Sequence, residues 1–108
     1  MPTTPEYATY IIDQLTQIQP ISSRKMFGGV GIFVEPGMFA LITSEDVLHF
    51  KVDDENRADY EAAGMSQFGR MPYYELPGDV LDSPDELATW MEKSIAAAER
   101  AAKNKKKK

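Results

Sequence analysis

The sequence contains no cysteine, and this absence removes several kinds of chemistry. Without cysteine there can be no disulfide bond, no thiolate ligand for a metal ion and no cysteine nucleophile. The sequence has one histidine and no apolar run that approaches the length of a membrane span. No charged segment followed by an apolar one opens the chain. These absences favour a protein of the reducing cytoplasm with no membrane association.

The residues that are present are those of one folded domain. The chain has 108 residues, of which 43% are hydrophobic and 10% aromatic, enough to form a single core. We expect one domain over residues 1–102, followed by a disordered lysine-rich tail over residues 103–108.

Charge is distributed unevenly along the chain. The formal net charge is −5, but the last six residues hold five of the 12 basic residues and no acidic one. The chain up to Ala102 therefore has 7 basic and 17 acidic residues, a net charge of −10. Nucleic-acid phosphates repel such a body, so we expect no direct sequence-specific DNA binding.

Hydrophobic periodicity and turn residues predict an α+β fold. A stripe of apolar residues at helical spacing indicates a first helix over about residues 4–18, and a second stripe indicates a long final helix that starts near Pro84. Asp53 begins a short helix that ends near Ala63. Short turns require antiparallel neighbours among the predicted strands, which cover residues 30–34, 38–42, 47–52, 65–68 and 71–76. The order α-β(3)-α-β(2)-α predicts a five-stranded antiparallel sheet with three helices.

The strand over residues 38–42 is apolar on both faces, which predicts a central place in the sheet. In the next strand, Leu48, Phe50 and Val52 point one way, whereas His49 and Lys51 point the other way, toward water. If helices cover only one face of the sheet, a second subunit or a partner protein must cover the other.

Three glycines, Gly28, Gly29 and Gly31, cluster at the start of the first predicted strand. With Arg24, Lys25 and Lys51 they could form a small anion- or nucleotide-binding module, because backbone N–H groups in glycine-rich loops bind phosphate. The other interpretation is structural. These glycines lead into a strand rather than a helix, which favours a bulge or close packing.

Few residues suggest catalysis. His49 lacks an evident catalytic partner in the sequence, and the acidic run Asp53-Asp54-Glu55 is interpreted as a helix cap rather than a cation site. We therefore predict no catalytic residue, no cofactor and no metal site. The methionines Met26, Met38, Met65, Met71 and Met91 could form an adaptable apolar surface, although most are expected to fill the core.

An ordered series of residues resembles the amino-terminal domain of the TfoX family, which includes the Sxy competence regulators. The series covers roughly residues 20–100 and comprises Met26-Phe27-Gly28-Gly29, Gly31-Ile32-Phe33, Met38-Phe39-Ala40-Leu41-Ile42, Leu48, Lys51, Asp53, Gly64, Phe68, Tyr73-Tyr74-Glu75-Leu76-Pro77, Leu81 and the segment 87–98 with Trp90. The resemblance implies a fold similar to secretion chaperones, no established catalytic residues, and a role in transcription and competence regulation. Longer members continue into a helical carboxy-terminal domain, and we expect a stand-alone copy here.

These observations lead to one main hypothesis. The chain is a non-enzymatic protein-interaction domain that associates with a protein partner or with itself, through an uncovered sheet face or the Gly28-Gly29 loop. The alternative is the anion- or nucleotide-binding module. The candidate contact residues are Arg24, Lys25, Met26, Phe27, Gly28, Gly29 and Lys51.

Overall fold

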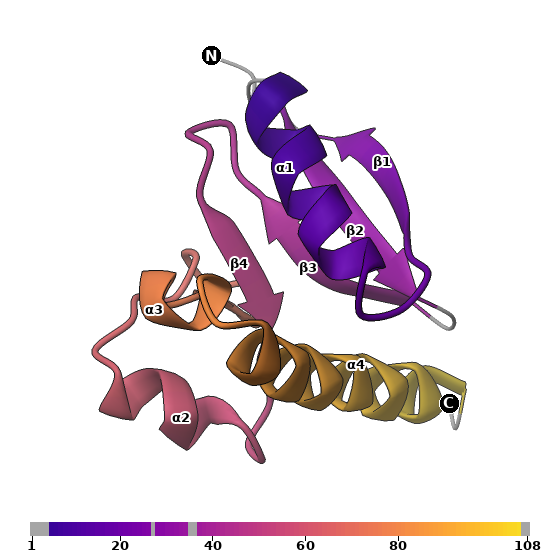
Figure 1. The fold of residues 1–108 in the computed structure, drawn as a ribbon. Helices are drawn as coiled ribbons and strands as arrows, with labels where there is room; N and C mark the ends of the chain where they lie inside the picture. The colour runs from indigo at the N-terminus through magenta and orange to yellow at the C-terminus, as the bar shows by residue number, and fades with distance from the viewer. Residues whose placement is uncertain (1–4, 27, 35–36, 107–108) are drawn as a thin grey trace.

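A computed structural model describes residues 5–26, 28–34 and 37–106 of the chain (Figure 1). Within these ranges the elements follow in the order α1 (Pro5–Thr16), β1 (Ser22–Met26), β2 (Gly29–Val34), β3 (Gly37–Ile42), β4 (Leu48–Lys51), α2 (Arg57–Ala62), β5 (Tyr73–Glu75), α3 (Gly78–Leu81) and α4 (Pro84–Lys106). The α+β class and the five-stranded antiparallel sheet are confirmed.

The sheet has the simple strand order β1-β2-β3-β4-β5, and every neighbouring pair is antiparallel. β3 therefore lies at the centre, as its apolar sequence predicts. Ile32 faces Ala40 and Phe33 faces Met38, which leaves Phe39 as an extra residue in β3. This bulge lets Phe39 join the core with its ring centroid 5.8 Å from that of Phe50.

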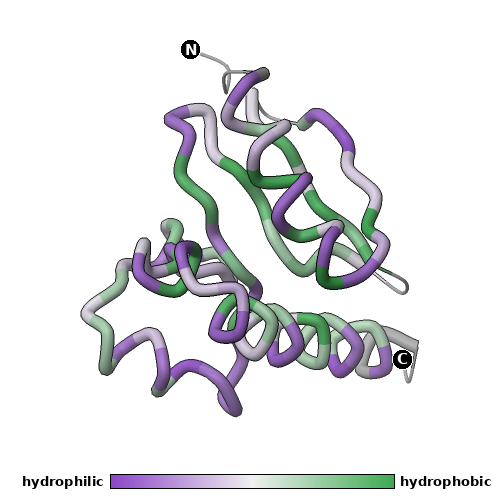
Figure 2. Tube along the Cα trace, viewed as in Figure 1, coloured by the Kyte–Doolittle hydropathy of each residue, from purple (hydrophilic) through white to green (hydrophobic). Residues whose placement is uncertain are grey.

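The helices α1 and α4 lie on one face of the sheet (Figure 1), and the main core fills the space between them and the strands. Figure 2 shows the hydrophobic residues concentrated along β2 and β3 and on the inner sides of these helices. The largest fully buried side chains include Ile11 and Leu15 of α1, Ile32 and Ile42 of the sheet, and Met91 of α4.

The partition of the strands differs from the prediction in two places. β1 was not predicted, because its sequence Ser22-Ser23-Arg24-Lys25-Met26 is polar, and it forms an exposed edge strand. The predicted strand over residues 65–68 contributes only one isolated bridge, between Gln67 and Tyr74. Gly69, at a φ of 57°, then turns the chain back toward β5.

The helices also differ in detail from the prediction. There are four among the described residues rather than three, because the single turn α3 is too short to leave a periodic signal. α4 extends to Lys106, so its last turn enters the predicted tail. The domain limit at Ala102 stays a prediction. No helix in the described part of the chain is both long and apolar enough to span a membrane.

Candidate functional site: the sheet face opposite the helices

In the described part of the chain, one face of the sheet carries no helix, and we call it the open face. The strand register places Arg24, Gly31, Leu41, His49 and Glu75 in one row across this face. By the alternation of side chains along each strand, further open-face residues are Met26, Phe33, Met38, Lys51 and Tyr73. The row has a charged residue at each end, Arg24 and Glu75, and Gly31 and Leu41 at its centre.

The prediction that His49 points toward water is wrong. The alternation was predicted correctly, since His49 faces away from the core residues Leu48 and Phe50, but His49 is only 6% exposed. The ring of Phe68 covers it, with the two ring centroids 5.1 Å apart. Burial lowers the pKa of His49, against smaller opposing effects of the Val47 carbonyl and Glu75.

The segment 66–72 holds Phe68 over the open face. The Phe68 N–H donates to the carbonyl of Tyr73 over 2.8 Å, and the Glu75 N–H donates to the carbonyl of Ser66 over 3.0 Å. Phe68 remains 39% exposed and, with Met26 and Leu41, lines a hollow of about 120 Å³. The sequence predicts that a second subunit or a partner protein covers the face without helices. In the structure, the segment 66–72 of the same chain covers part of that face.

Tyr73 is also buried on this face. Its hydroxyl donates to the Met38 carbonyl over 3.3 Å, and burial raises its pKa to about 12. The Lys51 ammonium lies 5.1 Å from the centre of the Tyr73 ring, a cation–π geometry. Lys51 is therefore placed against an aromatic ring rather than over the glycine loop.

The glycines fit tightly into the sheet. Gly28 has a φ of 78°, which L side chains rarely adopt. A Cβ at Gly29 would lie 2.0 Å from the Ile42 carbonyl oxygen, and one at Gly31 would lie 2.8 Å from the Met38 sulfur and 3.0 Å from the Met26 sulfur. The strand backbone and two methionines thus occupy the space that these glycines leave.

Of the three basic candidates, Arg24 pairs with Gly31, but the three side chains do not converge on those glycines. Arg24 lies on the open face, with its guanidinium 5.1 Å from the centre of the Phe33 ring. Lys25 pairs with the core residue Val30, so its side chain leaves from the other face. Phe27, the remaining candidate, lies outside the described residues.

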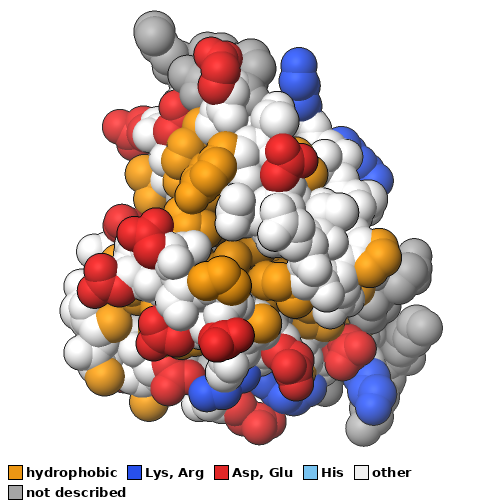
Figure 3. All heavy atoms as spheres, viewed as in Figure 1, with side chains coloured by type: hydrophobic (Ala, Val, Ile, Leu, Met, Phe, Trp, Pro, Cys, Tyr) orange, Lys and Arg blue, Asp and Glu red, His pale blue; other side chains and the backbone are white. Residues whose placement is uncertain are grey.

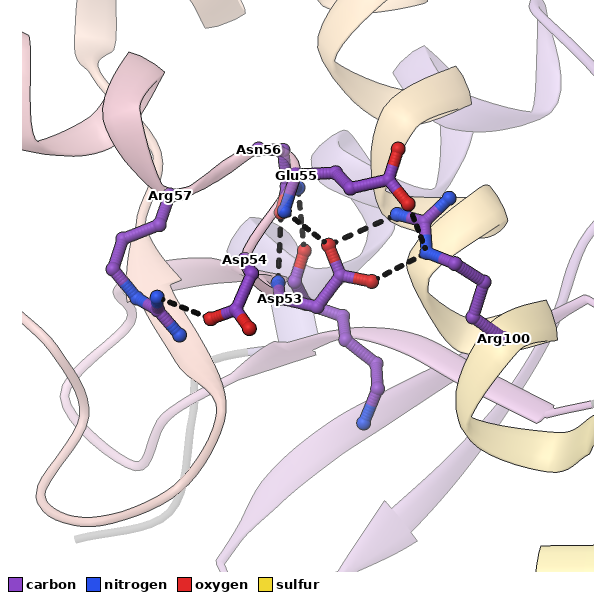
Figure 4. A network of polar contacts seen from close by, with 7 residues as sticks. Asp53, Asp54, Glu55, Asn56, Arg57 and Arg100 are labelled. Carbon is purple, nitrogen blue, oxygen red and sulfur yellow. Dashed lines mark hydrogen bonds and ion pairs between the residues drawn. The ribbon is translucent and has the colours of Figure 1, made fainter. Parts of the chain in front are cut away.

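The acidic run Asp53-Asp54-Glu55 after β4 connects the loop before α2 to the helix α4 (Figure 4). The Asp53 carboxylate accepts two hydrogen bonds from Arg100 of α4, at 2.6 and 2.9 Å, and one from the Glu55 N–H at 3.0 Å. The bonds from Arg100 are the main reason that the pKa of Asp53 is lowered. No group of three His, Cys, Asp or Glu residues in the described ranges is arranged to hold a metal ion.

The methionines divide between core and surface. Met91 is fully buried and Met65 packs against the core, whereas Met26 and Met38 are half-buried on the open face and Met71 is 47% exposed. Phe68 was recognised in the sequence only as part of the family series, not as a site residue. The feature of the sequence that could have identified Phe68 as a site residue is its position next to the turn at Gly69.

Comparison with protein families gives one result. The model of the TfoX N-terminal domain matches residues 13–98 of the chain, which include the whole sheet. A comparison with curated proteins finds no match.

Proposed function

Because the chain belongs to the TfoX N-terminal domain family, we propose that it is a non-enzymatic domain that binds a protein partner through the open face. The observation that carries this proposal is the one-sided placement of α1 and α4, which leaves Phe68, Met26 and Met38 as the outer layer over the other side of the sheet.

The chemistry of the open face suits a protein ligand. Phe68 gives an exposed aromatic ring beside a small hollow, and aromatic rings are common anchors in interfaces. Met26 and Met38 are flexible and polarizable, so they can adapt to the shape of a partner. Arg24, at the rim, adds an exposed cation that can orient an acidic group.

The ionisable residues of this face support a role other than catalysis. A general base needs access to its substrate and a pKa near the working pH. Phe68 covers His49, whose lowered pKa favours the neutral ring, and the raised pKa of Tyr73 keeps its hydroxyl protonated at neutral pH. The TfoX N-terminal domain is not a known enzyme family.

The wider role we propose is regulation of transcription, including competence, in the cytoplasm. The net charge of −10 up to Ala102 disfavours contact with DNA phosphates. Any effect on transcription would therefore pass through the bound protein.

The test compares affinity capture from the native cell by the wild-type chain and two open-face variants. We expect Phe68→Ser to lose the partner, since it removes the exposed ring. Arg24→Glu, a surface change that leaves the core intact, should weaken capture in the same way.

Two matched controls make the comparison specific. Tyr10→Ser removes another large exposed aromatic, 44% exposed on α1, and Lys103→Glu reverses an exposed charge on α4. Both should capture as much as the wild type. Equal capture by all folded variants would remove the open face from the mechanism.

A further inference from the structure

A second surface lies on the helix side of the sheet, between α1 and the pair α3 and α4. Figure 3 shows hydrophobic side chains in the middle of this side, with acidic side chains around them. Open hollows mark its two ends. One, of about 190 Å³, lies where Tyr7 faces Leu81 of α3, and the other, of about 670 Å³, lies where Val34 faces Ile95 of α4. We call this surface the helix-side groove.

The groove exposes residues that a closed helix pair would bury. Tyr7 lies on α1, Ile18 follows the end of that helix, and Ile95 lies on α4, yet all three are only half-buried. Val34 and Leu81 are half-buried in the same way. These residues pack against the core by one side and leave the other side to solvent. The groove therefore has an apolar floor that extends the main core to the surface.

The rim of the groove is predominantly acidic. Asp46 lines the hollow near α3, which Glu75 of the edge strand β5 also borders, and Glu92 and Glu99 line the hollow near the end of α1. The one basic residue among those that line these two hollows is Lys93, whose ammonium is 2.9 Å from the Asp59 carboxylate. A ligand in the groove thus meets negative charge at both ends.

We infer that the helix-side groove binds a basic amphipathic helix of a partner protein. The groove is lined by helices and by strands that, in the described part of the chain, already pair on both sides, β5 through Ser66 and Phe68, so it offers no free strand edge to an extended peptide. A helix satisfies its own backbone and can place an apolar stripe on the floor. Lysine or arginine beside that stripe would meet Asp46, Glu92 and Glu99, whereas nucleic acid and anionic lipid would be repelled.

The probe is a synthetic amphipathic peptide of about 18 residues with leucines on one stripe and lysines on both flanks. Its twin has the same leucines and glutamates in place of the lysines. We expect fluorescence anisotropy to show binding of the lysine peptide to the full chain and none of the glutamate twin. Amide NMR shifts should move at Leu81 and Ile95.

Charge-reversed variants locate the contact. The double variant Glu92→Lys, Glu99→Lys should weaken binding of the lysine peptide roughly tenfold, the combined effect of two exposed ion pairs. The control Glu45→Lys, Glu61→Lys makes the same change in net charge at residues that line neither hollow of the groove, one at the hollow of the open face and one on α2. It should weaken binding less than about twofold.

Three results would overturn the inference: equal binding of the two peptides, equal weakening by the two double variants, or NMR shifts at Phe68 in place of Leu81 and Ile95. Self-association of the chain through the groove would also overturn it, and sedimentation without peptide detects that. The inference is independent of the open face. Phe68→Ser should leave peptide binding unchanged, so either proposal can fail alone.

Discussion

Gly29 illustrates at the residue scale how a missing side chain can determine structure. A Cβ there would lie 2.0 Å from the Ile42 carbonyl oxygen, a backbone atom that cannot turn away as a flexible side chain can. The sequence indicated that the glycine cluster permits a close approach. It did not indicate that the approaching group is the neighbouring strand, because that contact depends on the register of β2 and β3.

Gly29→Ala should therefore destabilise the fold by about 1–3 kcal/mol, the usual cost of forcing an extra methyl group into a filled site. The measurement is urea denaturation followed by circular dichroism. Gly37→Ala is the matched control in the next strand, since a Cβ there would meet no atom within 4 Å. Equal stability of the two variants would contradict the tight fit.

His49 gives a prediction about pH. Its pKa is lowered in the folded state, so the unfolded chain binds more protons once the pH falls below the usual histidine value of about 6.5. Stability should be at its full value above that pH and should decrease below it, by at most about 1.4 kcal/mol per pH unit.

The variant His49→Phe isolates this effect. It keeps an aromatic ring against Phe68 and removes the titrating group, so the free energy of unfolding should vary less between about pH 6.5 and pH 5. Denaturation at several pH values checks this. Asp53 acts at lower pH, because its own pKa is lowered and its contribution is lost only as the pH falls below the usual aspartate range. An unchanged slope in His49→Phe would mean that another group titrates.

At the scale of the elements, Arg100 connects the end of α4 to the loop before α2. Its guanidinium donates two hydrogen bonds to Asp53 and lies 3.3 Å from Glu55 (Figure 4). Asn56 completes the loop, accepting from the Asp53 N–H and donating to the Lys51 carbonyl. The loop is thus anchored to both the sheet and the helix.

Arg100→Ala should cost about 1 kcal/mol, since the paired groups are about one-third exposed and solvent screens them. Arg57→Ala is the control, because the main partner of Arg57 is Asp54, in an exposed ion pair only three residues apart. Thermal unfolding should show a lower midpoint for the first variant and little change for the second. The reverse order would show that Arg100 does not anchor the loop.

The elements differ in how well the sequence predicts them. α1 and α4 have clear periodic stripes, and both were expected near their observed places. The apolar periodicity of α4 does not account for Ser94, which is fully buried with its hydroxyl oxygen 3.4 Å from that of Tyr60. A polar residue can be buried in the core when a residue far away in the sequence forms a hydrogen bond with it there. β1 escaped prediction for the opposite reason, since an exposed edge strand needs no apolar alternation.

At the scale of the whole molecule, the fold class followed from the pattern of the sequence. The central place of β3 follows from its two apolar faces, and the antiparallel sheet follows from short turns. Which face the helices cover, and how far the chain covers the other face itself, depends on long-range packing. The position of Phe68 over His49 belongs to that second kind of information.

The most direct measurement of the central claim is photo-crosslinking in the native cell from a photoreactive phenylalanine at the position of Phe68. The account predicts a covalent adduct with a partner protein from this position. It predicts no such adduct when the same group replaces Glu61, an exposed residue of α2. Adducts of the same yield from both positions, or from Glu61 alone, would contradict the assignment of the open face as the binding surface.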